Sequence, residues 1–287
     1  MAVYDRRYRG YDGPITALNA RWMVLPRFAW GQVFKARLFA VFFTICFVWP
    51  VVATLWIYLH HNLKALATMG LDASTLAPVD ATFFATFMGV QCFVFGGLLA
   101  LLVGPGLVSP DLANGALPLF LSRPITRTGY AVGKMATLAV LISLITWIPG
   151  LFLFFLQSWL EGWAWLAANA RVGFAIVVGA GIWIVTISLL SMAASALARR
   201  KVIAQTYLLG GIIFGGIAGQ VVNQMFDTKL GFAFALPELM HTVWEGLFQV
   251  PLSAQLTPLV AWLALAIICG LSIGILARKL KAFEVVK

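Results

Sequence analysis

Six runs of apolar residues, each long enough to cross a lipid bilayer, constrain the fold of this chain more than any other feature of its sequence. A spanning helix needs about 20 mostly apolar residues to cross roughly 30 Å of hydrocarbon. The runs lack the two-residue alternation of a membrane barrel strand. Because 62% of the 287 residues are hydrophobic and only 10% are charged, we predict an all-α integral membrane protein. The six predicted transmembrane helices cover 38–59, 82–103, 130–156, 172–196, 204–222 and 256–277.

The basic residues predict how these helices are oriented. Seventeen of the 20 Lys and Arg residues lie before span one, near the connection of spans two and three, in the turn between spans four and five, or after span six. Only Lys64, Arg171 and Lys229 remain for the other side. Cytoplasmic loops carry the excess of Lys and Arg, so both termini are expected to be cytoplasmic, in a multi-pass protein of the cytoplasmic (inner) membrane. The net charge of +10 is thus a topology signal, and no nucleic-acid partner is expected.

The chain divides into a cytoplasmic N-terminal segment (1–37), a six-helix transmembrane domain (38–277) and a cytoplasmic tail (278–287). Aromatic and basic residues mix in 26–39, which suits either a short helix in the plane of the membrane interface or a merely basic flank to span one. The segment 223–255 between spans five and six stays partly apolar. It predicts one or two short helices in the outer leaflet.

Span five carries Gly211, Gly215 and Gly219 at every fourth position, which leaves one helix face without side chains. Another backbone can approach such a face closely. The face therefore predicts either helix packing within this chain or the seam of a dimer.

Catalytic and energy-coupling motifs are missing from the sequence. It has no phosphate-binding loop, metal motif or nucleophile elbow, so we predict no enzyme activity, no metal site and no cofactor in this chain. The polar residues within the spans are amides and hydroxyls, which are expected to hydrogen-bond between helices. A site joining His241 to Glu238 or Glu245 is a minor alternative. If the protein performs work, its energy enters from another polypeptide.

The least apolar stretch in the middle of the chain is 109–134, between spans two and three. Ser109 suits an N-cap, Pro110 the first helical position and Asp111 the positive end of the helix dipole, so a short helix is predicted to begin at Pro110. Pro118 is predicted to kink or divide it. The segment offers apolar contacts rimmed by charge, which suits a socket on a partner protein; the alternative is a connection that packs on lipid headgroups.

This segment resembles the corresponding part of the permease subunits of type-2 ATP-binding-cassette (ABC-2 type) exporters. In that family it reads as an acid, then Gly and a hydrophobe, a Leu-Ser-Arg-Pro or related element, a basic residue, and Gly-Lys opening span three. The family also has about six spans, cytoplasmic termini, an interfacial helix before span one and outer helices between spans five and six. The family more often has Glu at the place of Asp111. The matching residues here are Asp111, Gly115, Leu117, Leu121, Ser122, Arg123, Pro124, Arg127, Gly133 and Lys134.

The resemblance implies a coupling helix within 109–127 that docks on a separate ABC ATPase subunit. Two permeases, identical or paralogous, and two ATPases would form the transporter, with ATP and Mg on the ATPases. Spans two and five would line the pathway, with the glycine face near the seam. The rival interpretation is a non-transport scaffold or anchor subunit of a larger membrane complex. The implied partner-binding residues are Asp111, Leu112, Gly115, Leu117, Ser122, Arg123, Pro124 and Arg127.

Overall fold

The computed structural model describes residues 22–62, 77–121, 126–250 and 256–280, and all the regular structure in these ranges is helical. Six of the described helical segments are long and apolar enough to cross a membrane, which confirms the predicted all-α membrane fold. Span 1 comprises α2 (Arg37–Ile45) and α3 (Val48–His61), and span 2 comprises α5 (Ala81–Gly89), the π-helix η3 (Val90–Gly96) and α6 (Gly97–Val103). Span 3 comprises α9 (Arg127–Ile145) and α10 (Trp147–Glu161); spans 4, 5 and 6 are α11 (Trp163–Leu197), α12 (Lys201–Phe226) and α14 (Pro258–Lys279).

Spans 3 and 4 are longer than predicted. The segment 157–171, which the sequence pattern assigned to a connection, is helical apart from Gly162. Gly162 has φ 94° and ψ 177°, a conformation that only glycine adopts readily, and this one residue turns the chain between α10 and α11. The prediction was wrong because the expected connection is mostly Trp, Ala and Leu, which can continue a helix on either side of a one-residue turn.

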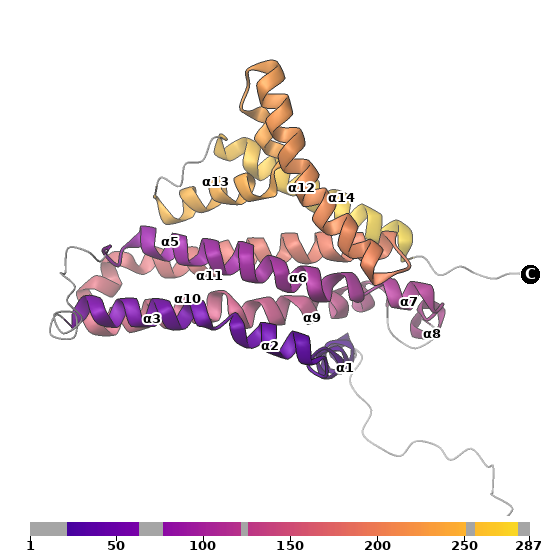
Figure 1. Cartoon of the computed structure of the whole chain (residues 1–287), viewed down its shortest axis with the longest axis horizontal. Helices are drawn as coiled ribbons and strands as arrows, with labels where there is room; N and C mark the ends of the chain where they lie inside the picture. Colours follow the sequence, from indigo (N-terminus) through magenta and orange to yellow (C-terminus); the bar gives the residue numbers. More distant parts are fainter. Residues whose placement is uncertain (1–21, 63–76, 122–125, 251–255, 281–287) are drawn as a thin grey trace, which may run out of the picture.

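The 35-residue helix α11 lies at the centre of the fold. It packs against spans 3, 5 and 6, and against the helix α13 (Leu236–Phe248), which follows span 5. In Figure 1, α12, α13 and α14 stand on one side of the long body formed by spans 1 to 4. The predicted short helices between spans 5 and 6 are present as the 3-10 helix η5 (Leu230–Phe234) and α13.

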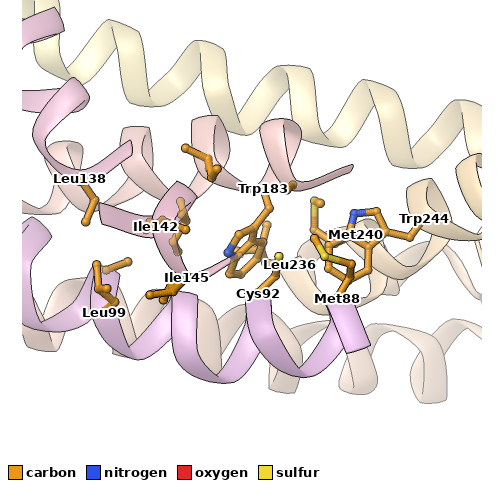
Figure 2. Close-up of a cluster of buried hydrophobic side chains, with 14 of the residues drawn as sticks. Met88, Cys92, Leu99, Leu138, Ile142, Ile145, Trp183, Leu236, Met240 and Trp244 are labelled. Carbon is orange, nitrogen blue, oxygen red and sulfur yellow. The ribbon is translucent and has the colours of Figure 1, made fainter. Parts of the chain in front are cut away.

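The buried core joins spans 2, 3 and 4 to α13. Met88, Cys92 and Leu99 of span 2 face Ile142 of span 3 and Trp183 of span 4 within one apolar cluster. Figure 2 shows that α13 closes one end of this cluster with its own buried side chains, Leu236, Met240 and Trp244. Through these contacts α13 belongs to the core of the bundle.

Two glutamine side chains compensate for prolines inside the spans. Pro50 has no N–H to donate to the carbonyl of Cys46, four residues earlier, and the buried amide of Gln91 donates to that carbonyl at 2.9 Å. Pro105 likewise leaves the carbonyl of Leu101 without its helical donor, and Gln205 of span 5 donates to it at 3.1 Å. These bonds confirm the predicted role between spans for Gln91 and Gln205. The hydroxyls of Thr146 and Thr206 instead donate within their own spans, to the carbonyls of Ile142 and Val202.

The described part of the N-terminal segment forms a helix, α1 (Val24–Val33), which lies beside α9. The indole N–H of Trp30 donates to the carbonyl of Thr137 at 3.1 Å, and Phe28 on the same helix is 68% exposed. The helix ends before Arg37, where span 1 begins. Its relation to a membrane plane stays a prediction.

Candidate functional site

Two short helices fill the connection between spans 2 and 3, where the sequence predicts a partner-binding element. The chain leaves span 2 through the 3-10 helix η4 (Gly104–Gly106) and forms α7 (Ser109–Ala113) and α8 (Leu117–Leu121). Figure 1 shows α7 and α8 at the same end of the bundle as α1, the start of α12 and the end of α14. We call this the basic end, because Lys134 and the run from Arg199 to Lys201 lie there.

The start of α7 differs from the prediction in its cap. The helix begins at Ser109, and Val108 occupies the N-cap position without a side-chain bond. The Ser109 hydroxyl instead donates to the carbonyl of Pro105 at 2.7 Å. The cap comes from span 4, because Oγ of Ser195 accepts the N–H groups of Val108 at 3.0 Å and Ser109 at 2.8 Å. A distant hydroxyl therefore satisfies the helix start that was assigned to Ser109.

The end of α7 explains the glycine of the motif. Gly115 has φ 63°, and the N–H of Ala116 donates to the carbonyl of Asp111 at 2.9 Å, as in a Schellman C-cap. The helix thus ends at Gly115. The prediction that Pro118 kinks or divides it was wrong. Pro118 lies in the first turn of α8, where a missing N–H costs little.

Tyr130, in the first turns of α9, holds both short helices. Its hydroxyl donates to Oδ2 of Asp111 at 2.6 Å, and its ring lies 5.7 Å from the ring of Phe120 on α8. Lys134, one turn further along, places Nζ 2.8 Å from the same Oδ2 and 5.5 Å from the centre of the Tyr130 ring. The side chains of Lys134 and Asp111 are only 14% and 18% exposed. The carboxylate of Asp111 thus forms its hydrogen bond and its ion pair with residues of its own chain.

The Gly-Lys pair that opens span 3 has two separate functions. Lys134 forms the ion pair with Asp111. Gly133 faces α1, and a Cβ atom there would lie 2.9 Å from the carbonyl oxygen of Trp22 and 3.0 Å from Cδ1 of Leu25. Only glycine lets α1 and α9 approach this closely. At the basic end, α9 therefore holds α1, α7 and α8.

The predicted partner-binding residues are distributed unevenly. Asp111 points towards Lys134 of its own chain, and Leu117 is buried. Leu112 is half-buried. Gly115 and Arg127 are exposed. Ser122, Arg123 and Pro124 lie outside the described residues. Pro110, Ala113, Asn114, Pro118 and Leu119 form the outer surface of α7 and α8.

The glycine face of span 5 packs within the chain over part of its length. A Cβ atom on Gly215 would meet the carbonyl oxygen of Phe234, and one on Gly219 would meet the carbonyl oxygen of Gly231, both in η5. A Cβ atom on Gly211 would meet nothing within 4 Å. The structure thus gives Gly215 and Gly219 a packing role inside the chain. The seam of a dimer stays a prediction.

A groove runs along spans 2 and 5. A cavity of about 540 Å³ is lined by both spans, by Trp183 and Ile187 of span 4, and by the start of α13. A second cavity of about 410 Å³ shares Leu101 and Leu209 with it and continues towards the basic end. The described residues that line the groove include no Asp, Glu, Lys or Arg. A volume of several hundred cubic ångströms with an apolar lining is typical of small-molecule sites.

Aromatic rings form the end of the groove next to α13. Phe93, on the π-helix of span 2, stacks on His241 at 5.3 Å with an interplanar angle of 15° and lies 4.8 Å from the ring of Trp183. Single-turn π-helices often occur at functional positions. The His241 ring stacks on Phe93, and among the described residues no hydrogen bond or ion pair joins it to Glu238 or Glu245, which does not favour the alternative site.

Sequence reasoning missed Tyr130 and the cap supplied by Ser195. Ser195 belongs to the polar residues that were expected to bond between helices, but nothing local indicates that its partner is the start of α7. Tyr130 precedes the recognised Gly-Lys pair by three residues, so its position one helical turn before Gly133 was the available signal.

The comparison with known protein families covers both the connection that contains α7 and α8 and the groove along spans 2 and 5. A family model described as ABC-2 family transporter protein matches residues 59–278, which include α7, α8 and the whole groove. No curated protein matches the chain.

Proposed function

Because this chain belongs to the ABC-2 family of transporter proteins and is thereby a permease component of an ABC transporter, we propose that ATP hydrolysis on a separate subunit drives export through it. The observation that carries the proposal is the pair of short helices, α7 and α8, held at the basic end between spans 2 and 3. An ATPase subunit that moves the permease must bind a segment whose backbone is held rigidly.

The internal contacts of α7 and α8 suit this task. Asp111, Tyr130 and Lys134 bind α7 to α9, and Phe120 binds α8 to the same turns. The side chains that hold the element face inward, while Ala113, Asn114 and Leu119 face outward. A surface of mixed apolar and polar residues on a fixed backbone supports docking of a protein partner.

The proposal also sets the orientation and the assembly. The basic end is cytoplasmic, because loops rich in Lys and Arg remain on that side of the inner membrane. ATP and Mg bind on the partner ATPase, and this chain needs no cofactor of its own. Two copies of the permease, or this chain and a paralogue, assemble with two ATPases.

The groove along spans 2 and 5 supports one half of a transport pathway. Its uncharged lining favours an apolar or amphipathic cargo over an ion, because an unpaired charge is costly to bring into such surroundings. A second permease would complete the pathway.

The test is purification of the tagged protein in mild detergent, with identification of bound subunits and an assay of ATP hydrolysis. We expect a stoichiometric subunit with a phosphate-binding loop. Leu119→Glu, at a position that is 70% exposed on α8, should reduce the amount bound. Leu230→Glu, at a position that is 61% exposed at the opposite end, is the matched control and should leave binding unchanged.

Two further variants separate docking from internal support. Asp111→Ala should weaken binding indirectly, because α7 loses its attachment to Tyr130 and Lys134. Arg123→Ala tests a motif residue outside the described part of the chain. Recovery of the wild-type protein in a large assembly without any ATPase would contradict the proposal and favour the scaffold.

A further inference from the structure

Three hydrogen bonds meet at the hydroxyl of Ser195, near the end of span 4. Its Oγ accepts the N–H groups of Val108 at 3.0 Å and Ser109 at 2.8 Å, and it donates to the carbonyl of Pro105 at 2.7 Å. Ser195 is fully buried. The side chain thus uses its donor and both acceptor positions on the joint between η4 and α7.

The chain from span 2 into α7 is interrupted twice. The π-helix η3 breaks the regular helical bonding in its middle, and the 3-10 helix η4, with sequence Gly-Pro-Gly, separates α6 from α7. Pro105 removes one backbone donor within that break. A helix interrupted in this way bends more readily than a regular one. The backbone that connects α7 to span 2 would therefore transmit a movement of α7 poorly.

Span 4 offers an unbroken route to the other end of the molecule. It is one helix from Trp163 to Leu197 and contains no proline. Near its middle it holds α13, because the indole N–H of Trp244 donates to the carbonyl of Gly179 at 3.2 Å. Arg171, further out on the same helix, donates to the carbonyls of Gly246 at 2.9 Å and Leu247 at 3.0 Å.

These contacts place both attachments on one helix. Gly179 and Ser195 are sixteen residues apart, about 24 Å along the helix axis, and Arg171 lies about 12 Å further along. A displacement of α7 that pulls on Ser195 therefore acts on the helix that carries α13. Because α13 forms the end of the groove at His241 and Pro237, its position sets how that end is closed.

We propose that Ser195 is a positioning residue that fixes α7 to span 4, so that a movement of α7 reaches α13 at the opposite end through the single helix α11. This inference rests on the proposed function, in which a partner ATPase moves α7. Coupling then follows the hydrogen bonds of Ser195 and does not follow the connection through span 2.

Three variants of Ser195 and one control variant isolate the contribution of its hydroxyl. Ser195→Ala removes all three hydrogen bonds, and Ser195→Thr restores a hydroxyl at the same place. Ser191→Ala is the matched control, because Ser191 lies one turn earlier on the same helix and is equally buried, while its hydroxyl has no partner among the described residues. Ser195→Cys keeps the size of the side chain with weaker hydrogen bonds and gives a graded variant should Ser195→Ala fail to fold.

The measurement is amide hydrogen exchange in the purified complex of permease and ATPase, with and without a non-hydrolysable ATP analogue. In the wild type and in Ser191→Ala, the nucleotide should change the exchange of α13. In Ser195→Ala, this change should fall at least about fivefold, the lower limit of ordinary coupling factors, when the variants are compared at equal amounts of bound ATPase. Ser195→Thr should recover most of the change.

The outcomes separate this inference from the function on which it rests. A wild-type preparation without an ATPase contradicts the proposed function itself. A complex that hydrolyses ATP but shows the same response of α13 in Ser195→Ala and Ser191→Ala supports the function and overturns the role of Ser195. An absent response of α13 in the active wild type also overturns it.

Discussion

Nζ of Lys134 lies 2.8 Å from Oδ2 of Asp111, and this ion pair joins α9 to the short helix α7. Tyr130 donates a hydrogen bond to the same oxygen atom. In the sequence, the acid and the lysine stand 23 residues apart and look like two separate contacts for a partner. In the structure, they form one internal support for the surface that the partner is proposed to meet.

The ion pair should contribute measurably to stability because both side chains are mostly buried. We expect Asp111→Asn and Lys134→Met each to lower the free energy of unfolding by about 1–3 kcal/mol, the range for hydrogen bonds to charged groups and for polar groups left without a partner. The double variant should cost less than the sum of the two single variants. Unfolding in mixed detergent micelles, followed by tryptophan fluorescence, provides the three values. Strictly additive effects would show that the two side chains do not interact.

Adjacent glycines of span 5 should respond to substitution with opposite sign. Gly215→Ala places a methyl group against the carbonyl oxygen of Phe234, so η5 must move, at a cost of about 1–3 kcal/mol. Gly216→Ala meets nothing within 4 Å and should gain up to about 1 kcal/mol from helix propensity. The same unfolding assay compares them. Equal effects at both positions would mean that η5 does not pack on α12.

The buried amide of Gln91 should matter only while Pro50 is present. Gln91→Leu leaves the carbonyl of Cys46 without its donor and should cost about 1–3 kcal/mol. In a Pro50→Ala background, residue 50 has an N–H that can donate to that carbonyl, so the same Gln91→Leu substitution should cost much less. The cycle of four proteins is compared by thermal unfolding in detergent. An undiminished cost in the Pro50→Ala background would place the contribution of Gln91 elsewhere.

The number and order of the six membrane spans could be predicted from the sequence because hydrophobic runs of membrane length have few alternatives. The segment 157–171 could not, because a single residue, Gly162, makes the turn that a longer polar loop usually makes. Local rules also predicted a short helix that begins at Pro110, and in the structure α7 begins one residue earlier, at Ser109. They assigned the cap to Ser109, since a rule based on neighbouring residues cannot find a donor or acceptor 86 residues away, such as Ser195.

For the candidate site, the motif indicated which residues matter better than it indicated why. Asp111, Gly115, Gly133 and Lys134 all have structural tasks at the basic end, as an ion pair, a C-cap and a close approach of two helices. A motif cannot distinguish residues that touch a partner from residues that hold the touching surface in place. That distinction needs the direction of each side chain, which depends on the packing of α7 and α8 against α9.

A larger side chain in the groove should stabilise the fold and slow ATP hydrolysis by the complex. Gly97 lines the larger cavity, and a Cβ atom there would lie 3.9 Å from Cζ2 of Trp183, so the first atom of a side chain fits without a clash. Gly97→Leu should raise the free energy of unfolding by about 1 kcal/mol, through apolar contacts and the loss of a helical glycine. If spans 2 and 5 change their separation during the ATPase cycle, the same leucine should slow hydrolysis by the reconstituted complex several-fold. Gly270→Leu, on an exposed face of α14 with nothing within 4 Å, gains the same helix propensity and should leave hydrolysis unchanged. Equal hydrolysis rates in the two variants would show that the groove takes no part in the cycle, because they differ in whether the added side chain enters it.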